Sequence, residues 1–325
     1  MSATALVREY VDHIRAFSPS ARLFLVAAML GGLSSGVSGV LLNLYILALG
    51  YDREFLGRLL SFGPVGAVVG AVLAVPLVYF LNTKRAMLAG ITFAGTGAVL
   101  LLISSAPDAL RAGIALTSMG SILFYTAVPP FLTKHSTQRE RAHLFGITVA
   151  AYVVSAAAGG LLAGYLYRAF ALAMPEGTPA DAYRMALFAG ALLTATGIPL
   201  IALVREDASS APTAVSPALS APRAQGILPA VRERVASLRT DVLESRTLWL
   251  LTQFILADVL IRFGGNLVLP FMNVHFIREL GTSEEMFGTL RFLERALVVG
   301  ATLAAAPLAL RFGPVTTIVL TQILS

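Results

Sequence analysis

Long uncharged stretches, separated by short charged segments, dominate the hydrophobic pattern of the chain. A helix needs about 20 apolar residues to cross the hydrocarbon core of a bilayer. Six stretches meet this requirement before the first long polar segment, and each predicts a membrane span. They run over Leu23 to Tyr51, Leu59 to Thr83, Ala86 to Pro107, Ala112 to Thr133, Leu144 to Tyr167 and Met185 to Val204.

The polar stretch after the sixth span has two parts. The first, EDASSAPTAVSPALSAPRAQG, is rich in Ser, Ala and Pro, which is typical of a flexible linker. In the second, Ile227 to Glu244, apolar residues recur at helical spacing among arginines, which predicts an amphipathic helix at the membrane surface. We expect a seventh span from Leu248 to about Ile277, an eighth from Met286 to Leu310, and the start of a ninth over Phe312 to Ser325.

An internal repeat relates the first spans to the last ones. A shift of 231 positions lays LGYDREFLG over LGTSEEMFG. The matched positions are Gly50 with Gly281, Gly57 with Gly288, Pro76 with Pro307 and, after a one-residue gap, Asn43 with Asn273. Both copies predict an apolar helix, a short charged turn that begins at a glycine, and a second apolar helix. Two diverged copies of one unit on either side of a polar linker indicate two related halves.

Composition and charge support this interpretation. Hydrophobic residues make up 57% of the 325 residues, charged residues 13%, and the mean hydropathy is +0.79, which is typical of an integral membrane protein. The net charge of +6 lies in the loops, so it indicates membrane orientation and not nucleic-acid binding. Most of the 24 Lys and Arg residues fall on the side of the N-terminus and the linker, which we therefore expect to be cytoplasmic.

Two loops carry short motifs. The turn after the fourth span reads KHSTQRERAHLFG, and it resembles the Glu-Arg-Ala-x-x-Phe-Gly junction of the major facilitator superfamily. The segment from Pro76 to Arg85 falls where that family has its cytoplasmic loop motif. Phe80 stands where the family's Asp would be, which weakens the case for the charge latch that this Asp supports in relatives. The residues that match the two motifs are Lys84, Arg85, Arg139, Glu140 and Arg141.

The resemblance implies an all-α bundle of two pseudo-repeated six-helix halves that rock about a site at the membrane midplane. On this plan residues 1–22 form a cytoplasmic segment, 23–204 the first half, 205–247 a cytoplasmic linker and 248–325 a partial second half. The chain would then hold about eight or nine of the family's twelve helices. We therefore expect it to be incomplete at the C-terminus.

The seventh span contains a polar stripe. Asp258, Arg262, Asn266 and Asn273 fall within about 80° of one helix face, and Asp258 and Arg262 have the spacing of an ion pair. An ionisable group inside a span costs about 2.5 to 3.5 kcal/mol, so it is usually paired and faces protein or water. The stripe predicts either a cavity lining with Asp258 as a proton or cation carrier, or a neutralised structural pair.

The eighth span carries Arg291, Glu294 and Arg295, where the first copy of the repeat has no charges. This asymmetry favours contact with substrate or a coupling ion, and a salt-bridge cluster between helices is the alternative. The net positive charge of the three would suit an anionic or zwitterionic substrate. Further candidates in the first half are Asn43, the counterpart of Asn273, and Tyr125 and Tyr152, which could bind a ligand or pack between helices.

Several classes of function lack their sequence signals. The chain has no cysteine, no phosphate-binding loop, no nucleophile elbow and no His-Glu-x-x-His motif, so we predict no enzyme activity, no cofactor and no metal site. The expected function is proton-coupled export of a small organic solute by a monomer in the plasma or inner membrane. The alternatives are metabolite uptake, a fragment inactive in transport, and a membrane-embedded enzyme acting on lipid.

Overall fold

The computed structural model describes residues 17–136, 141–204 and 245–312, and for some helix residues it describes the backbone alone. These ranges are helical and contain no strand, which confirms the all-α class. The first six helices are α2 (Pro19–Ala48), α3 (Arg53–Leu81), α4 (Thr83–Ile103), α5 (Pro107–Lys134), α6 (Arg141–Ala173) and α7 (Pro179–Leu203). Each contains a stretch long and apolar enough to cross a membrane, as the hydrophobic pattern predicted.

Capping residues define where these helices begin. The Ser18 side chain accepts a hydrogen bond from the backbone N–H of Ala21 at the start of α2 (3.2 Å). At the start of α7, Thr178 and Asp181 form a reciprocal capping box. Proline occupies the first position of both helices, where its missing N–H costs no hydrogen bond.

The second copy of the repeat forms the same helix as the first. Helix α11 spans Glu284–Phe312, and α3 spans Arg53–Leu81, so both have 29 residues and their bounds match under the shift found in the sequence. The matched glycines before them, Gly50 and Gly281, have positive φ values of 94° and 64°, a conformation that glycine adopts without strain. The matched residues Asp52 and Ser283 cap the two helices. The turn and the helix after it are therefore one structural unit that is present twice.

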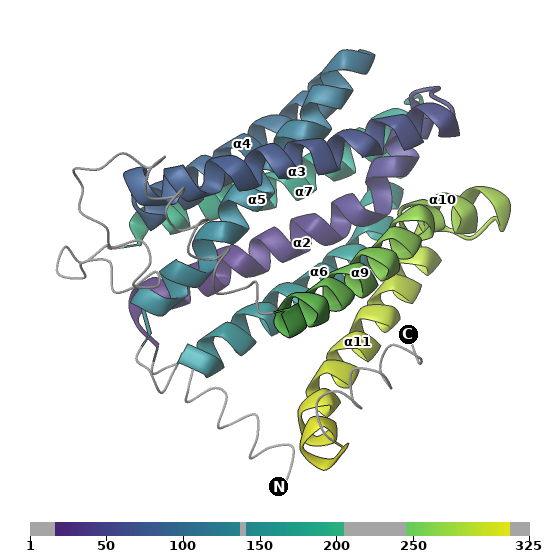
Figure 1. The fold of residues 1–325 in the computed structure, drawn as a ribbon. Coiled ribbons are helices and arrows are strands. Elements are labelled where there is room, and N and C mark those ends of the chain that lie inside the picture. The colour runs from purple at the N-terminus through teal and green to yellow at the C-terminus, as the bar shows by residue number, and fades with distance from the viewer. Residues whose placement is uncertain (1–16, 137–140, 205–244, 313–325) are drawn as a thin grey trace, which may run out of the picture. The chain divides into compact units, whose positions relative to one another are not determined.

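Glycines bring the helix backbones into contact. Helix α2 packs along α6 and α7, α5 packs along α3 and α4, and α6 also packs along α11 (Figure 1). A Cβ atom on Gly36 of α2 would overlap the carbonyl oxygen of Ala156 in α6 and lie 2.6 Å from the backbone nitrogen of Gly160. A Cβ on Gly90 of α4 would lie 2.6 Å from the backbone nitrogen of Phe124 in α5. Small residues at such crossings allow the van der Waals packing that holds membrane helices together.

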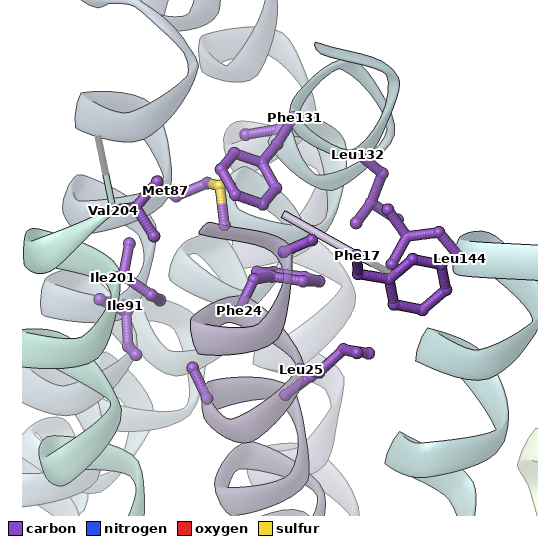
Figure 2. Close-up of a cluster of buried hydrophobic side chains, with 14 of the residues drawn as sticks. Phe17, Phe24, Leu25, Met87, Ile91, Phe131, Leu132, Leu144, Ile201 and Val204 are labelled. Carbon is purple, nitrogen blue, oxygen red and sulfur yellow. The ribbon is translucent and has the colours of Figure 1, made fainter. Parts of the chain in front are cut away.

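A buried apolar cluster joins the helices at the end of the bundle where α2 starts and α7 stops. It contains Phe17, Phe24, Leu25, Met87, Ile91, Phe131, Leu132, Leu144, Ile201 and Val204 (Figure 2). The rings of Phe24 and Phe131 lie 5.0 Å apart. The side chains come from α2, α4, α5, α6, α7 and the segments beside them, so the cluster fixes this end of five helices.

The predicted seventh span is not one continuous helix. Helix α9 spans Ser245–Val268, a 3₁₀ turn follows over Leu269–Phe271, and then come the short α10 (Met272–Val274) and a π-helical turn, η3 (His275–Glu279). The break falls at Pro270, which cannot donate the hydrogen bond that an α-helix needs at this position. Helix α9 and the 3₁₀ turn after it, up to Met272, belong to one compact unit. The segment from Asn273 to the end of α11 belongs to the unit of the first six helices.

Three parts of the sequence prediction lie outside the described residues. These are the N-terminal segment up to residue 16, the linker with its amphipathic helix over 205–244, and the start of a ninth span after residue 312.

The crossing of α2 and α6 generates a prediction with a matched control. Replacing Gly36 by Ala places a methyl group against the α6 backbone, and overpacking of this kind costs about 1–3 kcal/mol. We expect Gly36→Ala to lower the thermal unfolding midpoint of the protein in detergent, followed by the circular dichroism of its helices. Gly39 of the same helix has no atom within 4 Å of its Cβ position. Gly39→Ala should therefore leave the midpoint unchanged or raise it, and equal losses in both variants would contradict the packing account.

Candidate functional site

The two matched asparagines, Asn43 and Asn273, contact each other. The side-chain nitrogen of Asn43 in α2 donates a hydrogen bond to the side-chain oxygen of Asn273 in α10 (3.2 Å). Asn273 in turn donates to the backbone carbonyl of Val40 (2.8 Å). Both side chains are buried, with exposed fractions of 8% and 3%. A buried amide needs such partners, so the pair ties α2 to the segment that follows the break at Pro270.

Helix α11 carries Arg291, Glu294 and Arg295, and Arg291 lies on the same side of α6 as Val40. Arg291 Nη1 and Glu294 Oε2 are 2.5 Å apart, an ion pair within one helix. A Cβ on Gly160 of α6 would lie 3.9 Å from the Cβ of Arg291 and 3.8 Å from Val40, so Arg291 faces the place where α2 and α6 cross. Val40 thus lies near both the asparagine pair and Arg291.

Exposure differs among the three charges. The side chain of Arg291 is 28% exposed and that of Glu294 is 47% exposed. Arg295 is half-buried and has no ion-pair partner among the described side chains. One turn of α11 therefore carries an ion pair and, beside it, the half-buried Arg295.

Tyr125 and Tyr152 form a separate pair. Their rings, from α5 and α6, meet edge to face with centroids 6.1 Å apart. Tyr125 is 46% exposed and Tyr152 is half-buried. The backbone of Tyr152 also packs against Gly32 of α2, so the pair lies where α6 contacts both α2 and α5.

The polar stripe of the seventh span is only partly described. Asp258, Arg262 and Asn266 lie in the continuous helix α9, and for these three the structure describes the backbone alone. The prediction that Asp258 and Arg262 form an ion pair remains a prediction. Asn273, the fourth member of the stripe, lies beyond the break and faces α2.

The motif residues that the structure describes lie at the end of the bundle where α4 and α6 begin and α7 ends. Lys84 Nζ donates to the backbone carbonyls of Ala202 (2.6 Å) and Val204 (2.8 Å), so it caps the C-terminal end of α7. Arg85 is exposed. Arg139 and Glu140 lie outside the described residues, and Arg141 is described by its backbone alone, as the first residue of α6. In this structure Lys84 stabilises a helix end within the first six helices.

Sequence reasoning missed a set of polar contacts where α3, α7 and α11 begin and α6 ends. Glu279 accepts a hydrogen bond from Arg53 of α3, and this contact lowers the pKa of the Glu279 carboxyl. Tyr183 of α7 donates to Glu284 (2.5 Å), and Arg168 of α6 donates to Glu285 (3.1 Å). The available signal was the replacement of Asp52-Arg53-Glu54 in the first copy by Ser283-Glu284-Glu285 in the second.

Comparison with known proteins agrees with this architecture. The model of the Major Facilitator Superfamily matches residues 23–325. Six chains in solved structures match, among them a bacterial homologue of the human lysosomal transporter Spinster, in an inward-facing and unoccupied conformation. The two chains are 17% identical with a TM-score of 0.62, and the match covers 91% of this chain and 63% of that one. A search of curated proteins found no match.

These observations define a multi-pass helical membrane protein. Because the family model covers most of the sequence, the chain belongs to the major facilitator superfamily. The similarity to the Spinster homologue, at 17% identity, supports the fold alone. The predicted resemblance is therefore confirmed.

The asparagine pair generates a prediction for a double-mutant cycle. Asn43→Ala and Asn273→Ala should each destabilise the protein, because each removes the hydrogen bond between the two side chains. The coupling free energy between the two substitutions should be about 0.6 kcal/mol and at most about 1.7 kcal/mol, the range for hydrogen bonds between membrane helices. It can be measured by reversible unfolding in mixed micelles. Asn43→Ala combined with Ser136→Ala, at the opposite end of the bundle, should be additive.

Proposed function

We propose that this protein is a secondary active transporter that moves a small organic solute across a membrane by alternating access. The observation that carries the proposal is the match to the family model over residues 23–325. In proteins built from two related halves, the substrate site lies at the interface between the halves, near the middle of the membrane. Arg291 of α11 supports this location, because its Cβ lies near the place where α2 and α6 cross.

We infer that transport is coupled to protons, with Asp258 and Glu294 as the carboxylates that carry them. Glu294 supports this role because it pairs with Arg291 within the predicted eighth span. Protonation of Glu294 would remove the ion pair and leave the Arg291 charge without its partner. A solute with a negatively charged group could then bind Arg291 and Arg295. This exchange of partners would link proton binding to substrate binding.

The remaining candidates would have supporting roles. Arg262 would hold Asp258 in its charged state, and Asn266 would extend the same polar face of α9. Tyr125 and Tyr152 would offer hydroxyl groups to the polar part of the solute. The asparagine pair would keep the segment after Pro270 against α2 while the cavity is occupied.

We propose that the N-terminus and the linker are cytoplasmic, that the protein lies in the plasma or inner membrane, and that it exports its solute. The excess of Lys and Arg on the side of the N-terminus supports the orientation. The end of the bundle where α3, α7 and α11 begin is then the outer end.

Transport in proteoliposomes tests the coupling. With a panel of organic anions and zwitterions, we expect solute-dependent proton movement, followed with a pH dye enclosed in the vesicles. Asp258→Asn and Glu294→Gln should each reduce this movement at least about tenfold, the effect of losing roughly 1.4 kcal/mol of coupling.

Glu176→Gln serves as the control for this experiment. Glu176 lies exposed in the turn between α6 and α7, outside the proposed site. It should leave proton movement unchanged. Solute uptake without proton movement would overturn the coupling, and transport retained in both carboxylate variants would overturn the assignment of Asp258 and Glu294.

Cysteine labelling tests the orientation, because the sequence contains no natural cysteine. Glu176→Cys and Arg85→Cys place single thiols in exposed positions at opposite ends of the bundle. A membrane-impermeant maleimide should label Glu176→Cys in intact cells, and it should label Arg85→Cys only after the cells are broken. The reverse pattern would show that the N-terminus is on the outside.

A further inference from the structure

The segment from Glu279 to Glu285 contacts three different helices through three glutamates. Glu279 pairs with Arg53 at the start of α3. Glu284 accepts the hydrogen bond of the Tyr183 hydroxyl in α7 (2.5 Å), and the Tyr183 ring stacks on Tyr167 of α6, with centroids 4.2 Å apart. Glu285 pairs with Arg168 near the end of α6 (3.1 Å). Seven consecutive residues thus connect α11 to the ends of α3, α6 and α7.

The backbones of α6 and α11 also touch beside these side-chain contacts. A Cβ on Gly164 of α6 would lie 2.5 Å from the Cα of Glu285, and a Cβ on Gly288 of α11 would lie 2.5 Å from the carbonyl oxygen of Gly160. Side chains at these positions would force α6 and α11 apart. The glycines therefore bring Glu284 and Glu285 within reach of their partners.

The first copy of the repeat uses the same positions differently. Glu54, which matches Glu285, pairs with Arg58 of its own helix, with Oε1 and Nη1 3.6 Å apart. Arg53, which matches Glu284, is the partner of Glu279. Contacts between helices through carboxylates at this end are thus a property of the second copy.

We propose that Glu279, Glu284 and Glu285 form a three-point latch that holds the outer end of the bundle closed and whose release sets the opening of that end. This inference rests on the proposed alternating access, since a latch has a purpose only if the outer end opens during transport. Opening would separate α11 from α3, α6 and α7, and the three contacts must break together for it to occur.

The strengths of the contacts suit a reversible device. The Arg53 and Arg168 side chains are 63% and 66% exposed, so water and salt screen their ion pairs and each pair is individually weak. The Tyr183–Glu284 contact is half-buried and joins a neutral donor to a carboxylate, which makes it the strongest of the three. Together the three contacts favour the closed over the open state by a factor on the order of ten. A transport cycle can reverse a preference of this size.

Distance measurements between spin labels test the latch in the full chain, reconstituted in lipid nanodiscs. Labels at Glu176→Cys and Leu280→Cys, two exposed positions at this end, report the separation of the α6–α7 turn from the latch segment. In a variant with Glu279→Gln, Glu284→Gln and Glu285→Gln together, we expect the ratio of long to short distances to rise on the order of tenfold.

Glu54→Gln is the matched control. It removes a carboxylate from the equivalent position of the first copy, whose partner lies on its own helix. Its distance distribution should equal that of the unmodified protein. An unchanged distribution in the triple variant, or an equal change in Glu54→Gln, would overturn the latch.

Exchanging the two charges of one ion pair distinguishes loss of the latch from a general loss of folding. Arg168→Glu alone should increase the long-distance population, and Arg168→Glu with Glu285→Arg should restore the short distance, because the pair is re-formed with its charges exchanged. Failure of the double exchange to restore a folded, monodisperse protein to the short distance would count against the proposal. These distance measurements need no substrate. If the latch behaves as expected but the protein shows no proton-coupled transport, the proposed function is overturned and the latch is not.

Discussion

The close approach of helix backbones at glycines is the constraint on which the rest of this structure depends. Inside a bilayer the hydrophobic effect does not drive helices together, so association relies on packing and on interhelical hydrogen bonds. Helix α6 shows the consequence most clearly. Gly159 faces Leu33 of α2 and Gly160 faces Gly288 of α11, so one helix is in backbone contact with a partner on each side. The asparagine pair and the carboxylate contacts exist because these crossings bring their side chains within reach.

One structural unit has acquired two roles in this chain. Gly66 and Gly70 of α3 let it pack closely against α5. The matched positions in α11 are Leu297 and Ala301, so α11 lacks the two glycines on which that packing depends. Leu297 is 75% exposed. Instead α11 carries charged residues at positions 291, 294 and 295, where α3 has Leu60, Gly63 and Pro64. The same helix frame therefore serves as scaffold in one copy and carries the candidate chemistry in the other.

The break at Pro270 connects these features. A continuous α-helix would give the residues after Val268 the same backbone geometry as α9. Instead the 3₁₀ and π turns interrupt the helix, and Asn273 reaches α2 while Glu279 reaches the start of α3. Asn273 and Val274 of this interrupted segment are buried, and Asn273 donates a hydrogen bond to the backbone carbonyl of Val40. In the proposed transport cycle, this segment would link movements of α11 to the first six helices.

The sequence by itself determined the class, the six apolar helices, the repeat and the family, because these depend on hydrophobic length, local turn chemistry and short motifs. Even the positive φ values of Gly50 and Gly281 follow from such local signals. Only the tertiary structure decided that Asn43 and Asn273 bond to each other, that Lys84 caps α7, and that Glu284 and Glu285 contact α7 and α6. Those outcomes depend on which helices touch and on where along their lengths they cross. Crossing points between helices are set by close packing over the whole bundle, which no single stretch of sequence encodes.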